Sequence, residues 1–173
     1  MAQVTSSSTP HPHHPRPLLE RDAWLNLNGV WELAVVEGRD VPATFPLAVM
    51  VPFCVESALS GVMEAVALSH SLVYRRTFTL PPSWASTNIL LHFEAVDYSS
   101  QVTPSSLPPL QVLVNGVLAG KHTGGYDAFT LDITGLVVEG EQEIVVIVED
   151  PTETQVMVVH VLVAVMLNWL WSW

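Results

Sequence analysis

The chain has 173 residues and a mass of 18.9 kDa, which suits one domain and excludes a (β/α)8 barrel of about 250 residues. Hydrophobic residues make up 49% of the chain and charged residues 13%, so a buried core can form and wholesale disorder is excluded. Six basic against 17 acidic side chains give a formal net charge of -11, which repels phosphate backbones, so we expect no nucleic-acid partner.

The first 15 residues, MAQVTSSSTPHPHHP, are rich in proline and serine and lack the apolar run of a secretory signal peptide. We therefore expect a disordered lead-in over residues 1–15 and, by default, a cytoplasmic location. His11, His13 and His14 are potential metal ligands. Because no rigid frame or fourth ligand accompanies them, an ordinary disordered tail is the favoured interpretation, and we assign no metal.

A periodicity of two dominates the middle of the chain, where turn residues separate short apolar runs. Ile89, Leu91 and Phe93, for example, share one face of a predicted strand. The pair Asn115-Gly116 predicts a tight hairpin, because both residues tolerate a positive φ. The predicted strands are residues 30–36, 72–80, 89–95, 112–114, 118–122, 128–131 and 143–149.

A helical pattern occurs only at residues 132–138, where Asp132 is placed as a cap. Short strands with frequent turns favour an all-β sandwich or jelly roll.

Several conspicuous residues near the start have structural roles in this interpretation. Leu25, Leu27 and Trp31 are expected in the core, and residues 26–29 form the turn before the first predicted strand. Cys54 is the only cysteine, so neither an internal disulfide nor a cysteine-ligated zinc site can form. No histidine lies near it in sequence, and a small buried hydrophobic residue is favoured over a nucleophile.

The arginine pair and a tryptophan further along the chain are interpreted in the same way. Arg75 and Arg76 could contact a ligand, but pairing with Glu94 or Asp97 on a neighbouring strand is favoured. Trp84 follows two prolines and is expected to close a loop rather than to offer a binding platform.

Residues 156–173, VMVVHVLVAVMLNWLWSW, carry no formal charge. Their length reaches the lower edge of a transmembrane span, roughly 17–25 residues. His160 and Asn168 interrupt the run and no Lys or Arg flanks it, so a membrane span is disfavoured but stays open. The segment lacks the alternation of a half-buried strand, and its valines and missing charge indicate aggregation. We expect a chain ending at Glu153 to be more soluble.

Six sequence blocks, in this order, closely resemble the N-terminal sugar-binding jelly-roll domain of glycoside hydrolase family 2, the family of β-galactosidases, β-glucuronidases and β-mannosidases. The blocks are PRPLLERDAWLNLNGVWEL, VPFCVESALSG, VYRRTFTLPPSW, LLHFEAVDYSSQ, VLVNGVLAGKHTGGYDAFTLDIT and GEQEIVVIVEDPTE. The resemblance implies a galactose-binding-domain-like jelly-roll sandwich over residues 16–153. It also implies a link to hydrolysis of O-glycosyl bonds in carbohydrate metabolism.

The resemblance does not carry over catalysis. Family members are retaining glycosidases, which use two carboxylates about 5–5.5 Å apart. In the family both carboxylates stand on a downstream barrel, and no residue here matches either motif. We therefore expect a fragment that is inactive alone, with no catalytic residue and no cofactor. Tyr126 and Asp127 are the candidates for sugar contact. The alternative is that their corner, which includes Phe129, mainly anchors a turn, as it does in the family.

Two segments depart from the family pattern. Residues 102–111, VTPSSLPPLQ, carry three prolines that cannot sit in a central ladder, so we interpret them as an insertion that loops out. Their deletion is expected to raise the melting temperature. The insertion and the apolar tail at 154–173 both look like stray translated sequence, such as a retained intron, which leaves the domain incomplete.

Two other functions stay open: a stand-alone carbohydrate-binding module, and an interaction domain tethered to a membrane by the tail.

Overall fold

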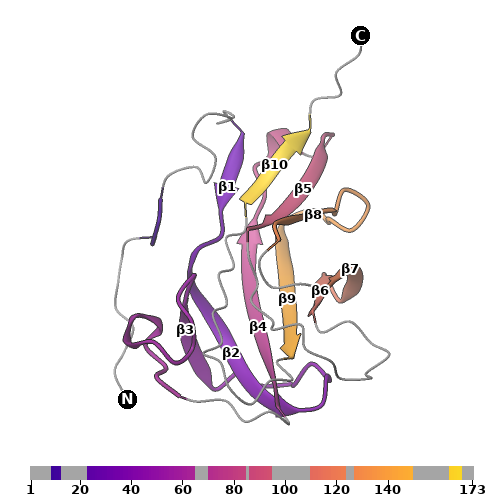
Figure 1. The fold of residues 1–173 in the computed structure, drawn as a ribbon. Coiled ribbons are helices and arrows are strands. Elements are labelled where there is room, and N and C mark those ends of the chain that lie inside the picture. The colour runs from indigo at the N-terminus through magenta and orange to yellow at the C-terminus, as the bar shows by residue number, and fades with distance from the viewer. Residues whose placement is uncertain are drawn as a thin grey trace.

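The computed structural model describes residues 9–12, 23–64, 70–84, 86–94, 110–123, 127–149 and 164–168. The strands in these residues pair antiparallel into two sheets that form a sandwich (Figure 1). One sheet has the order β3-β2-β4-β9-β6-β7 and the other the order β1-β10-β5-β8. The strands are β1 (Trp24–Asn26), β2 (Gly29–Glu37), β3 (Leu47–Val51), β4 (His70–Thr79), β5 (Asn88–Phe93), β6 (Leu110–Val114), β7 (Val117–His122), β8 (Phe129–Asp132), β9 (Glu141–Glu149) and β10 (Ala164–Asn168).

The all-β prediction is confirmed, and each predicted strand overlaps an observed one. Strands β1, β3 and β10 were not predicted. β1 has only three residues, and β3, with the sequence LAVMV, has no alternation between polar and apolar side chains. A short apolar run of this kind gives no periodic signal, because both of its faces are apolar.

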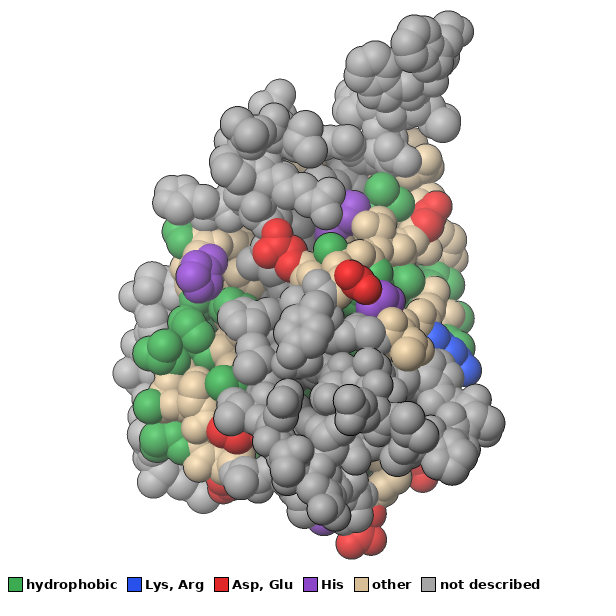
Figure 2. Space-filling view, viewed as in Figure 1, with side chains coloured by type: hydrophobic (Ala, Val, Ile, Leu, Met, Phe, Trp, Pro, Cys, Tyr) green, Lys and Arg blue, Asp and Glu red, His purple; other side chains and the backbone are tan. Residues whose placement is uncertain are grey.

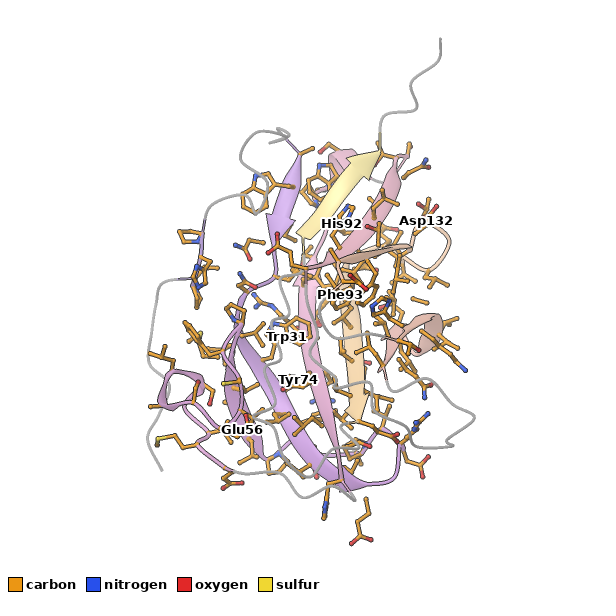
Figure 3. The ribbon with its side chains drawn as sticks, in the orientation of Figure 1. Trp31, Glu56, Tyr74, His92, Phe93 and Asp132 are labelled. Atoms are coloured by element: carbon orange, nitrogen blue, oxygen red, sulfur yellow. The ribbon has the colours of Figure 1, made fainter. Side chains whose placement is uncertain are left out.

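The core lies between the two sheets. β5 alternates as predicted, with Ile89, Leu91 and Phe93 buried and its other side chains partly exposed. Trp31 of β2 and Tyr74 of β4 face these residues from the other sheet (Figure 3). Leu27 and Trp31 are buried as expected, and Leu25 packs against the core from a partly buried position. Burying a large apolar side chain contributes roughly 1.5–3 kcal/mol.

The six-stranded sheet is also covered on its outer face. Val73, Val145 and Ile147 form a second buried cluster there, against which Phe45 and Leu113 pack. β9 is consequently buried on both faces, which explains its almost continuous run of apolar residues.

The hairpin prediction is confirmed at Asn115-Gly116, where φ is 51° and 76°. The helical turn predicted at residues 132–138 is reduced to one hydrogen-bonded turn, in which the Leu136 N–H donates to the Ile133 carbonyl at 2.9 Å. Asp132 still acts as a local cap, since its carboxylate accepts hydrogen bonds from the backbone N–H and the hydroxyl of Thr134.

The structure differs from the predicted insertion at its last two residues. Leu110 and Gln111 belong to β6 and are paired with Val148 and Ile147 of β9. Leu110 is buried, which makes it part of the sheet rather than of a loop. The rest of the insertion lies outside the described residues.

The lead-in differs from the expected disorder at residues 9–12. The Asn28 side-chain amide donates to the Pro10 carbonyl at 3.3 Å, and the Asn26 amide donates to the His11 carbonyl at 2.9 Å. The two asparagines thus hold this short segment against the turn that precedes β2. The remaining residues of the lead-in, with His13 and His14, lie outside the described residues.

The tail also differs from its expectation, because five of its residues form β10 between β1 and β5. An uncharged apolar run without alternation is found in strands that have a neighbour on each side, so this pattern alone did not distinguish such a strand from an exposed segment. In the described part of the chain, no helix is long and apolar enough to cross a membrane.

Candidate functional site

The corner between β7 and β8 carries the residues expected to contact sugar. Asp127 lies there with an exposed side chain, two residues before β8 begins. Tyr126 lies outside the described residues. On the described surface facing the viewer in Figure 2, acidic and histidine side chains lie at several separate places, including the middle, and the basic atoms lie at the right-hand edge.

Phe129 holds this corner in place. Its ring stacks on Phe93 with centroids 4.6 Å apart and on His122 with centroids 4.1 Å apart, at interplanar angles of 8° and 13°. Two parallel rings this close must lie on opposite faces of Phe129, because they would overlap on one face. Both faces are therefore covered, so Phe129 anchors the turn and cannot stack on a sugar.

Close packing between the sheets fixes the same corner. A Cβ atom added to Gly120 of β7 would lie 2.5 Å from Cδ2 of Leu131 on β8. The Leu131 side chain would have to shift to make room for any larger residue at position 120. The His122 Nε2 atom is buried and has no hydrogen-bond partner among the described residues. Asp127 is exposed beside this closely packed corner, and its carboxylate can accept hydrogen bonds from hydroxyl groups.

A groove with a volume of about 520 Å³ lies elsewhere, beside the 3-10 helix η3 (Pro82–Trp84). This size falls within the range of small-molecule sites. Its lining residues are Thr79, Leu80, Pro81, Pro82, Trp84, Val137, Val138, Glu139 and Gly140, among which Glu139 has the only charge. Trp84 is 8% exposed and belongs to the core, so the expectation that it closes a loop is confirmed.

One wall of the groove is held by a buried amide network. Gln142, fully buried, accepts at Oε1 from the Val138 N–H and from the Asn115 side-chain amide, both at 2.9 Å. Its Nε2 donates to the carbonyls of Val138 at 2.7 Å and Gly140 at 2.9 Å. The network fixes residues 138–140 against the hairpin at Asn115. Sequence reasoning missed it, although a glutamine in the apolar strand β9 is the signal that could have revealed it.

The two arginines of β4 are engaged with neighbours other than those predicted. Arg75 donates to Glu32 of β2 at 2.7 Å, and this hydrogen bond raises the pKa of Arg75. The expected pairing with Glu94 or Asp97 was wrong for Arg75, because β2 and β9 flank β4 and β5 belongs to the other sheet.

Arg76 points into the molecule. Its guanidinium donates to the carbonyls of Leu27 at 2.6 Å and Asn28 at 2.8 Å, and burial lowers its pKa. Arg76 therefore clamps the turn before β2, an arrangement that serves the fold rather than a ligand.

A third group of polar residues lies near Tyr74, whose hydroxyl is buried without a hydrogen-bond partner among the described residues. Burial, and secondarily the charges of Glu56 and Cys54, raise the pKa of Tyr74 far above its usual range. Figure 3 shows Glu56 in the loop after β3, below Tyr74. Cys54, which was predicted to be buried, is partly buried. Because Tyr74 is almost completely buried, its hydroxyl is out of reach of a substrate at the surface.

Comparisons of the sequence and structure with known proteins identify the family of this domain. The family model described as "Glycosyl hydrolases family 2, sugar binding domain" matches residues 43–160. A β-glucuronidase of Paenibacillus borealis is 27% identical over 141 residues, which are 78% of this chain and 22% of that protein. The chain spans 7% and 22% of the length of the two curated relatives.

Solved structures agree with this result. The β-D-glucuronidase of Dictyoglomus thermophilum is 26% identical with a TM-score of 0.55, over 78% of this chain and 21% of that one. The β-D-mannosidase of the same organism is 23% identical with a TM-score of 0.57, over 75% of this chain and 16% of that one. At 23% identity the likeness shows the fold alone.

Proposed function

The chain belongs to glycosyl hydrolase family 2 as a sugar-binding domain, and on that premise we propose that it serves a longer β-glucuronidase-like glycosidase and contacts carbohydrate at the β7–β8 corner. The observation that carries the site is the exposed carboxylate of Asp127, held on a corner that the Phe93–Phe129–His122 stack makes rigid. Tyr126 is the neighbouring residue that we propose as its partner in sugar contact.

The charge at this corner indicates which part of a glycan it binds. A carboxylate accepts hydrogen bonds from neutral hydroxyl groups and repels another carboxylate. The formal net charge of -11 adds to that repulsion. We therefore propose that the corner binds the hydroxyl groups of a glycan chain, and that any uronate group is recognised elsewhere in the longer enzyme.

Sugar binding by the full chain tests the site. We expect saturation-transfer NMR to detect methyl β-D-glucoside more strongly than methyl β-D-glucuronide, and Asp127→Asn to weaken the glucoside signal several-fold. Glu139→Gln is the matched control, because it removes an exposed carboxylate at the groove instead. If Glu139→Gln abolishes binding and Asp127→Asn does not, the groove binds the sugar and our placement is wrong.

Turnover tests the assignment to a longer enzyme. We expect the purified chain to leave nitrophenyl glucuronides, galactosides and mannosides intact, because no carboxylate here matches the family's catalytic pair. Hydrolysis that survives purification and disappears when one acidic residue of this chain is mutated would overturn that assignment.

A further inference from the structure

The four-stranded sheet contains a position that is filled from the end of the chain. β10 pairs with β1 from Trp24↔Met166 to Asn26↔Ala164, and with β5 from Ala164↔His92 to Asn168↔Asn88. Both ladders are antiparallel. β10 therefore forms backbone hydrogen bonds with β1 on one side and with β5 on the other (Figure 1). Strands in a sheet lie about 4.7–4.9 Å apart. With β10 between them, β1 and β5 are therefore two strand spacings apart, roughly 9–10 Å, which is too far for them to pair with each other.

β10 connects β1 to the rest of the four-stranded sheet. In the described sheet, β10 is the strand on which β1 pairs, while β5 also pairs with β8. Filling the position thus attaches β1 to the sheet and covers the edge of β5. Unpaired edges bind extended segments readily, because their N–H and C=O groups are already aligned.

The chemistry of the position defines its ligand. Its hydrogen bonds come from the backbone, so they demand an extended segment with a free N–H at each paired residue rather than particular side chains. Residues 156–173 supply such a segment without formal charge or proline. Residues 150–163 separate β9 from β10. A connection of this length mainly raises the local concentration of the strand.

We propose that the space between β1 and β5 is a peptide-binding site for an extended, uncharged strand. Its ligand is the segment Ala164–Asn168, bound non-covalently, which the site accepts as a separate peptide as well as from the same chain. The proposal is independent of sugar binding.

Cleavage of the folded full chain tests the site. A protease recognition sequence inserted after Glu153 allows the tail to be cut off once the protein has folded. We expect the cut tail to stay with the domain in size-exclusion chromatography. An excess of a fluorescent peptide of residues 161–171, with lysines added at both ends for solubility, should then replace it.

The same peptide with Met166→Pro is the control, because proline removes the N–H at the centre of the paired segment. We expect at least tenfold weaker binding. Separation of the tail on cleavage, or equal binding of both peptides, would overturn the proposal.

Cysteine pairs test the register. In a Cys54→Ser background, Leu25→Cys with Val165→Cys places two thiols on directly paired residues. Leu25→Cys with Met166→Cys is the control, because neighbouring residues of a strand point to opposite faces. We expect oxidation to link the first pair much faster, within one chain or between two copies. Equal rates for the two pairs in protein with a native circular dichroism spectrum would contradict the site.

Discussion

The two sheets of the sandwich differ in how their strands are held. In the six-stranded sheet, β4 pairs with β9 over nine positions and with β2 over six, all from the middle of the chain. In the four-stranded sheet the ladders have three, five and four positions, and one strand comes from the tail. The first sheet thus contains its own stabilising pairs, whereas the second depends on β10. Changes to the two sheets should therefore have unequal effects.

The largest effect is expected from removing the tail. A chain ending at Glu153 lacks both ladders of β10 and exposes the edges of β1 and β5. At about 1 kcal/mol for each net hydrogen bond, the loss is on the order of 5 kcal/mol or more. This reverses the expectation from sequence that truncation raises solubility. Urea unfolding and the soluble fraction after expression measure the difference from the full chain.

A chain ending at Asn168 is the matched control, because it keeps β10 and removes five residues of the apolar tail. We expect its stability to stay within about 1 kcal/mol of the full chain. If both truncations behave alike, β10 does not stabilise the sheet.

The next effect concerns the insertion, which ends at the six-stranded sheet. Deleting residues 102–111 removes the ladder positions of Leu110 and Gln111 and the buried Leu110 side chain. We expect a loss of about 2–5 kcal/mol. Deleting only residues 102–109 keeps β6 intact and shortens a connection, which should change the stability by about 1 kcal/mol or less. Thermal unfolding of both variants distinguishes them, and a lower melting temperature for the longer deletion alone supports the boundary.

Strands in both sheets could be predicted where their side chains alternate or where glycine turns separate them. Ile89, Leu91 and Phe93 were assigned to one face from spacing alone, and Asn115-Gly116 fixed a hairpin from local chemistry. The partner of Arg75 could not be predicted in this way. It depends on the order of the strands, which is a property of the whole fold rather than of a segment.

The candidate site shows the same limit. Asp127 is proposed from a local motif, whereas the stacking of Phe129 between two rings involves residues of β5, β7 and β8 that are far apart in sequence. The groove likewise joins residues near 80 with residues near 138. β10 was missed because an apolar run has the same appearance in a sheet, in a bilayer and in an aggregate.

An intermediate effect is expected at the amide network of the six-stranded sheet. Gln142→Ala leaves the N–H and C=O of Val138 and the Asn115 amide without one of their partners. We expect a loss of about 2–4 kcal/mol, because several buried polar groups lose hydrogen bonds together. Gln111→Ala is the control, since that side chain is only partly buried. Equal losses in urea unfolding would show that the network contributes little.

A smaller effect, of opposite sign, is expected at Tyr74. Its buried hydroxyl has no hydrogen-bond partner among the described residues, so Tyr74→Phe removes a desolvated polar group and leaves the ring in place. We expect stability unchanged or raised by about 1 kcal/mol. Trp31→Phe is the contrasting variant, because the indole N–H donates to the Leu27 carbonyl at 2.7 Å. It should lower stability by about 1–3 kcal/mol, and chemical denaturation measures both.

The smallest effect is a dependence on pH at the end of β8, in the four-stranded sheet. Hydrogen bonds from the hydroxyl and backbone N–H of Thr134 lower the pKa of Asp132 below its usual 3.8. The folded state therefore favours the charged carboxylate, and this stabilisation is present above the unfolded pKa. The stabilisation is lost as the pH falls through the lower folded pKa.

The contribution of Asp132 is small because its side chain is exposed. We expect the melting temperatures of the unmodified chain and Asp132→Asn to differ at pH 7 and to approach each other as the pH falls through the lowered pKa of Asp132. Asp127→Asn, which changes an exposed carboxylate of the neighbouring corner, is the reference for a general charge effect. A difference for Asp132→Asn that stays constant with pH would show that the Thr134 hydrogen bonds do not stabilise the ionised form.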